Sequence, residues 1–191
     1  MFRRLFGSAL LAALAVPVMA QQPRSPGPPG AQQTRTPPLA AADHYAPYDW
    51  LIGDWYGKAG PGLLREQITY GPGRGYIKFS VFTAADESGP QHLHFEGIAL
   101  WNARTKVLDY LFAVEPGSGV QEGGTLRADA DGSIVREVQL IDSKGSVGTF
   151  RQTFVRTSPN RAVTTLFRKT EAGWVPTFPG SEKIELTRRP G

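Results

Sequence analysis

The 191-residue sequence has no cysteine and only three histidines. Without cysteine, the chain can form no disulfide bond, no thiolate metal site and no cysteine nucleophile. A lipid anchor of the kind that is attached to a cysteine is excluded for the same reason. The stability of the folded protein must therefore come from a packed core.

The chain also has little net charge once its N-terminal segment is set aside. The formal net charge is +4, but four basic residues and one acidic residue precede residue 46, which leaves 17 basic and 16 acidic groups in the remainder. A nearly neutral domain has no net electrostatic attraction to a phosphate backbone. Nucleic acid is therefore not an expected partner.

The first twenty residues have the composition of a secretory signal peptide. Arg3 and Arg4 form a charged start, residues 5–16 are rich in Leu and Ala, and Val18–Ala20 provides small residues for cleavage. The apolar run is too short for a membrane span. We expect residues 1–20 to be removed, leaving a periplasmic or secreted protein with no membrane anchor; the paired arginines leave Sec and twin-arginine export both open.

Residues 21–45 form a segment rich in proline. Six prolines and no aromatic residue occur between Gln21 and Ala42. Such a composition buries too little apolar surface to offset the entropy of ordering. We expect a disordered linker over residues 21–45, with a specific role as a proline-rich ligand as the alternative, and one folded domain over residues 46–191.

The folded domain contains short runs of β-branched and aromatic residues separated by turn-forming residues such as Asp131-Gly132, with almost no helical periodicity. Ile77, Phe79 and Val81 alternate with polar neighbours, as expected for a strand with one wet face. The predicted strands are Trp55–Lys58, Leu64–Tyr70, Gly75–Thr83, Gln91–Trp101, Val107–Val114, Gly119–Ala128, Ser133–Ile141, Ser146–Arg156, Arg161–Arg168, Trp174–Pro176 and Lys183–Arg188.

Short connections favour an antiparallel up-and-down order, and an open sheet of this many strands would leave two unpaired edges. Closure of the sheet removes both edges. The fold class predicted is therefore all-β, a single antiparallel barrel of about ten strands. Pro47 to Gly53 begins with proline and ends with glycine, which is typical of a short helical cap at one barrel end.

The segment Gly53-Asp-Trp-Tyr-Gly57 resembles the Gly-x-Trp opening of lipocalin-like (calycin) barrels, and is most similar to nitrobindin-like and uncharacterised exported bacterial members. The resemblance implies that Trp55 plugs one barrel end and that an arginine from a late strand, Arg168 or Arg188, covers it. The nitrobindin-like subset binds haem through a histidine on a late strand. Here no histidine follows His94, so neither haem nor any other cofactor is expected.

His92-Leu-His-Phe-Glu96 is the one cluster of titratable residues with an interpretable spacing. On a regular strand, His92, His94 and Glu96 would share one face, opposite Leu93 and Phe95. The three polar groups suit half of a metal site or an acid–base pair. A solvent-exposed polar face is the alternative, and we favour it, so no metal site and no catalytic residue is predicted.

Aromatic residues supply much of the bulk of the predicted strands, and an aromatic-lined interior suits an apolar or amphipathic ligand. The sequence thus predicts a non-enzymatic protein that binds or carries a small molecule. An enzyme that uses His94 and Glu96 for proton transfer, or a structural envelope protein, are the alternatives. Candidate ligand-binding residues are Trp55, His92, His94, Glu96, Trp101 and Tyr110. The sequence does not indicate an oligomeric state.

Overall fold

The computed structural model describes residues 43–86 and 89–189. The expected signal peptide and nearly all of the expected linker lie outside these residues. Within the described part of the chain, no helix is both long enough and apolar enough to cross a membrane.

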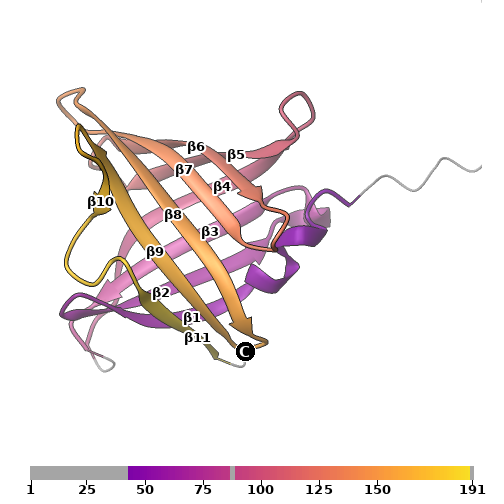
Figure 1. The fold of residues 1–191 in the computed structure, drawn as a ribbon, viewed down its shortest axis with the longest axis horizontal. Coiled ribbons are helices and arrows are strands. Elements are labelled where there is room, and N and C mark those ends of the chain that lie inside the picture. The colour runs from indigo at the N-terminus through magenta and orange to yellow at the C-terminus, as the bar shows by residue number, and fades with distance from the viewer. Residues whose placement is uncertain (1–42, 87–88, 190–191) are drawn as a thin grey trace, which may run out of the picture. The chain divides into compact units, whose positions relative to one another are not determined.

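The described chain is all-β, as predicted, with two short 3-10 helices (Figure 1). The helices are η1 (Ala46–Leu51) and η2 (Pro72–Arg74). The strands are β1 (Gly53–Ala59), β2 (Gly62–Tyr70), β3 (Ile77–Ala84), β4 (His92–Asn102), β5 (Val107–Val114), β6 (Val120–Ala128), β7 (Ile134–Ile141), β8 (Val147–Ser158), β9 (Arg161–Thr170), β10 (Gly173–Pro176) and β11 (Ile184–Arg189).

The strands form one closed antiparallel barrel. Consecutive strands pair from β1 through β9, and β11 pairs with both β9 and β1, which closes the ring. Among the described strands, ten make up this ring, because β10 pairs only with the far half of β9. Closure satisfies the backbone groups that an open sheet would leave unpaired.

Alternation along the strands divides an inner from an outer face. In β5, Leu108, Tyr110, Phe112 and Val114 are buried, whereas the intervening Leu111 is 59% exposed. The period of two follows from the pleat of the strand, which directs successive side chains to opposite faces. The buried set forms part of a continuous core inside the barrel.

One end of the barrel is closed by η1 and by Trp55. Trp55 is 1% exposed and its Nε1 donates a hydrogen bond of 2.7 Å to the carbonyl oxygen of Leu51. The β1–β11 register places Arg188 opposite Trp55, and its guanidinium carbon lies 4.6 Å from the indole centroid. Of the two arginines expected to cover the tryptophan, Arg188 therefore does so.

Glycine at position 53 permits this close approach. Gly53 has a φ of +147°, and a Cβ atom there would lie 3.1 Å from Nε of Arg188. Gly57, on the same strand, would place a Cβ 2.6 Å from the carbonyl oxygen of Glu185. Both glycines therefore let β1 pack closely against β11.

Packed residues begin before Ala46. The Tyr45 side chain is 8% exposed; its hydroxyl donates to the carbonyl oxygen of Gly75 and accepts from the backbone N–H of Trp101. The His44 ring stacks on the Trp101 ring with centroids 4.1 Å apart. These two residues, which the sequence places in the linker, belong to the closed end of the barrel.

Strand β4 is not regular, and this corrects the expected placement of its polar residues. The β3–β4 register shifts between Val81, which pairs with Phe95, and Phe82, which pairs with Leu93. His94 is the extra residue of a β-bulge, so alternation is interrupted there. Neither of the two arrangements expected of a regular strand is therefore correct: His94 and Phe95 both line the interior, whereas Glu96 does not.

Candidate functional site

The barrel contains a cavity of about 510 Å³ on the side of the core away from Trp55. Gly60 and Pro61, in the β1–β2 turn, line the cavity and are also exposed, so the cavity reaches the surface there. Most of its wall is apolar and aromatic. The apolar lining residues of the strands are Ala59, Leu64, Phe79, Val81, Phe95, Leu140, Phe150, Phe154, Leu166 and Ile184, and the β10–β11 loop adds Phe178.

A layer of polar side chains separates the cavity from the packed end. Glu66 lies opposite Trp55 in the β1–β2 ladder, and Arg136 lies opposite Gln152 in the β7–β8 ladder. With Tyr110 and Glu122, these side chains line the cavity and are nevertheless buried. We call these five residues, Glu66, Tyr110, Glu122, Arg136 and Gln152, the polar floor.

Arg136 is the centre of the polar floor. Its Nη1 donates a hydrogen bond of 2.5 Å to the Tyr110 hydroxyl and lies 3.4 Å from Oε2 of Glu122. Gln152 connects the opposite side through its Nε2, which lies 3.4 Å from Oε1 of Glu66 and donates to Thr164 Oγ1 at 3.0 Å. Both signs of charge are thus present in a buried layer of otherwise apolar surroundings.

Burial changes the protonation behaviour of the polar floor. Desolvation raises the pKa of Glu66 to about 7, against smaller lowering effects from the Arg136 charge and the Gln152 hydrogen bond. Desolvation likewise raises the pKa of Tyr110. Burial disfavours the charged form of Arg136, yet Tyr110, Glu122 and Glu66 together raise its pKa, so it stays a cation. Glu66 therefore exchanges a proton near neutral pH beside a fixed positive charge.

Two buried atoms of the polar floor have no hydrogen-bond partner within the described chain. They are Nε of Arg136, a donor, and Oε2 of Glu122, an acceptor whose 3.4 Å approach to Arg136 forms an ion pair and not a hydrogen bond. Leaving such atoms unpaired in an apolar setting costs roughly 1–3 kcal/mol each. A molecule in the cavity with one acceptor and one donor would satisfy both.

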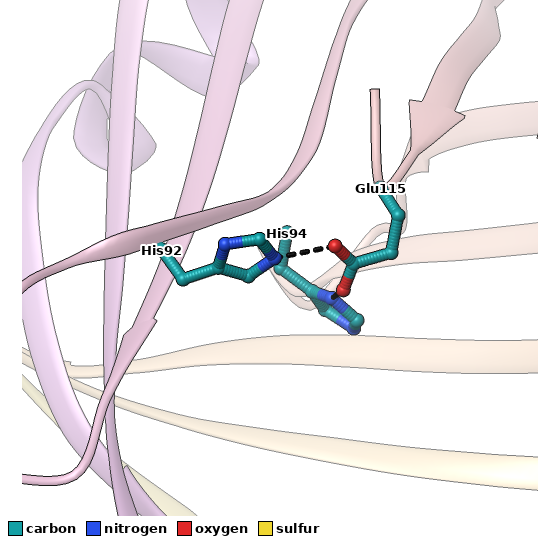
Figure 2. Close-up of side chains that lie close together, drawn as sticks. All are labelled: His92, His94 and Glu115. Carbon is teal, nitrogen blue, oxygen red and sulfur yellow. Dashed lines mark hydrogen bonds and ion pairs between the residues drawn. The ribbon is translucent and has the colours of Figure 1, made fainter. Parts of the chain in front are cut away.

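A second polar group lies at the rim of the cavity, where β4 begins. Figure 2 shows the rings of His92 and His94 directed at one carboxylate, that of Glu115, which follows β5. His92 Nε2 contacts one oxygen of this carboxylate and His94 Nδ1 contacts the other. The hydrogen bonds from His92 and His94 lower the pKa of Glu115. We call these three residues the rim cluster.

The structure separates the six residues expected to bind a ligand. Tyr110 and His94 line the cavity, and His92 joins His94 in the rim cluster. Trp55 and Trp101 belong to the packed end and do not line the cavity. Glu96 forms an ion pair of 2.7 Å with the exposed Lys78 and does not line the cavity.

Sequence reasoning missed the remaining members of both groups. Glu66 shares the inner face of β2 with Leu64 and Ile68, and Arg136 alternates with Ile134 and Val138. A charged residue in the apolar phase of a strand is the signal that identifies the polar floor. Glu115 had no comparable signal, because it follows another strand.

Comparison with known proteins gives a likeness of fold. No known protein family matches this sequence, and no curated protein matches it. The structure is similar to the crystal structure of Rv2717c from M. tuberculosis, with a TM-score of 0.50 and 18% sequence identity, covering 78% of this chain and 99% of the other. At this identity the likeness shows the fold alone.

Proposed function

We propose that this protein is an exported binding or carrier protein that holds a small amphipathic molecule inside the barrel. The observation that carries the proposal is the cavity of about 510 Å³, with apolar walls above a buried polar floor. Ligand sites in proteins are typically about 300–1,000 Å³ and combine apolar walls with a few polar groups. The lipocalin-like assignment and export to the periplasm or beyond are parts of this proposal.

The apolar body of the ligand would lie against the aromatic wall. Phe79, Phe95, Phe150 and Phe154 come from strands β3, β4 and β8, so they surround the cavity from several directions. Burial of apolar ligand surface contributes about 25 cal/mol per Å². The wall therefore supplies affinity without specifying one ligand.

The head group of the ligand would face the polar floor. Arg136 Nε requires an acceptor and Glu122 Oε2 requires a donor. A group that carries both, such as an alcohol, an amide or a carboxylic acid in its protonated form, matches this pair. Such a head group fixes the orientation of the ligand.

One observation favours a second candidate, an enzyme that uses the same cavity. A carboxyl group with a pKa of about 7 beside a cation is suited to general acid–base catalysis. The proton-transfer group would then be Glu66, because Glu96 does not line the cavity and pairs with Lys78 instead. A purely structural role, by contrast, requires no interior space.

The test is a fluorescence titration with N-phenyl-1-naphthylamine, an apolar dye, on two matched variants. Leu140→Trp introduces a bulky side chain at the cavity wall, whereas Leu111→Trp introduces the same side chain on the exposed outer face. We expect saturable 1:1 binding by the wild type and by Leu111→Trp, and at least about tenfold weaker binding by Leu140→Trp.

Equal binding by the three proteins, or no saturable binding by the wild type, would contradict the proposal. Mass spectrometry of an organic extract of the exported protein would then identify a co-purified ligand. Turnover of that ligand by the wild type but not by Glu66→Gln would favour the enzyme over the carrier.

A further inference from the structure

We propose that the rim cluster is a binding site for a divalent metal ion of the zinc type. The donor atoms of His92, His94 and Glu115 all lie within 4.8 Å of one another. Figure 2 shows the two imidazole rings directed at the two oxygens of the Glu115 carboxylate. A single ion could therefore contact all three side chains after small side-chain movements.

The donor set matches this class of metal. Two imidazole nitrogens and one carboxylate oxygen bind Zn²⁺ in several catalytic sites, at about 2.0–2.2 Å from the ion. Magnesium and calcium prefer sites made of oxygen ligands alone. Three protein donors leave at least one position of a four-coordinate ion open to water or to another molecule.

The backbone is arranged to bring these donors together. On a regular strand, His92 and His94 would be separated by about 7 Å along one face. The bulge at His94 interrupts that spacing and re-aims its ring. Glu115 adopts a φ of +45°, in the left-handed region, and its N–H donates to the carbonyl oxygen of His94 at 2.7 Å.

Left-handed backbone is unfavourable for a residue with a side chain. The strand bulge, the turn and the hydrogen bond between them fix Glu115 beside the histidines. This combination of features, together with two imidazole rings directed at one carboxylate, is not expected of an ordinary surface turn.

The position of the site connects it with the cavity. His94 lines the cavity, whereas His92 and Glu115 are more exposed. An ion held by the rim cluster would lie at the border of the interior, with its open position available to a donor atom of a molecule there. The metal site does not depend on the proposed function, because its three ligands all come from the chain itself.

The test is calorimetric titration of zinc chloride into tag-free protein that has been treated with a chelator. We expect one ion per chain for the wild type. His94→Ala and Glu115→Gln should each weaken binding by at least about tenfold, and His92→Ala/His94→Ala should abolish it. Circular dichroism checks that each variant is folded.

Two variants serve as matched controls. His44→Ala removes the histidine that stacks on Trp101, and Glu96→Gln removes the carboxylate that pairs with Lys78; both should retain one site. NMR of the wild type provides an independent measurement, because zinc should shift the ring signals of His92 and His94 but not those of His44.

A wild type that binds no zinc, or binds it no better than His92→Ala/His94→Ala, would overturn the metal site. In that case the rim cluster would be a hydrogen-bonded tether between β4 and the β5–β6 turn. Zinc binding without binding of N-phenyl-1-naphthylamine would instead overturn only the proposed function, so the two failures are distinguishable.

Discussion

At the end of the barrel that carries η1, the interior is filled by Trp55, Leu51, Ile68 and Leu126, each no more than 1% exposed. On the far side of the polar floor, the same ladder of strands encloses a cavity of about 510 Å³. The hydrogen-bonded ladder of strands is continuous through both regions, so the difference lies in the side chains and in the η1 cap. Tight packing at one end supplies stability, and this allows the other end to remain hollow.

The largest expected effect is at the packed end. Trp55→Ala should lower the free energy of unfolding by about 3–5 kcal/mol, because it leaves a cavity that the surrounding barrel cannot fill. Chemical denaturation measures this loss. Trp174→Ala is the control, since Trp174 lies on β10, outside the core, with Arg151 4.3 Å from its ring. Equal losses for the two variants would show that Trp55 does not plug the barrel.

A substitution at the polar floor is expected to raise the free energy of unfolding, by less than Trp55→Ala lowers it. Glu66 has a folded-state pKa of about 7, above its ordinary value of 4.5, so the folded protein retains a proton that the unfolded chain releases between these pH values. The stability contributed by this residue therefore falls as pH rises from about 4.5 to about 7. Glu66→Gln cannot ionise, so it removes the cost of holding a charged carboxylate in this buried position at high pH.

The Glu66→Gln variant and the wild type should be equally stable near pH 4, and the variant should be more stable by roughly 3 kcal/mol at pH 8. Denaturation series at several pH values test this. Glu185→Gln is a matched control, because the exposed Lys183 ion pair lowers the pKa of Glu185 and its small contribution is lost as pH falls. A pH-independent difference for Glu66→Gln would contradict buried ionisation.

No effect at all is expected from haem, although the hollow end contains space. The late-strand residues that line the cavity, Phe150, Gln152, Phe154, Leu166 and Ile184, include no histidine. Haem added to the purified protein should therefore give no stoichiometric complex. A sharp Soret band that survived gel filtration and disappeared in His94→Ala would show axial ligation from the rim and reverse this prediction.

The packed end could be predicted from sequence far better than the hollow end. Runs of β-branched and aromatic residues between turn-forming residues located every strand, because these signals are local. The resemblance of the Gly53–Gly57 segment to lipocalin-like barrels implied the Trp55 plug and a late arginine that covers it. The polar floor depends on side chains from β2, β5, β6, β7 and β8 that meet only after closure. Its one local signal is a charged residue at a strand position where the alternation predicts an apolar one, as at Glu66.

The sequence singled out His92 and His94, but their meeting with Glu115 could not be predicted, for two physical reasons. Glu115 is 21 residues from His94 and reaches it only through the β4–β5 pairing and the turn that follows. The bulge at His94 has no distinctive residue, since it results from how β3 and β4 match in register. A strict two-residue period therefore assigned Glu96 to a face that it does not share with His94.

The closing pair of strands also has a consequence for how the protein is made. β1 pairs with β11, so Asp54 meets Arg189, and the ring cannot close until nearly the whole chain is available. Pairings between residues so distant in sequence form slowly, because a long loop must be ordered first. Until then β1 and β9 carry exposed edges that can pair with other chains. An export route that delivers the chain unfolded would therefore expose it to aggregation until its last strand arrives, and that strand also brings Arg188 onto Trp55.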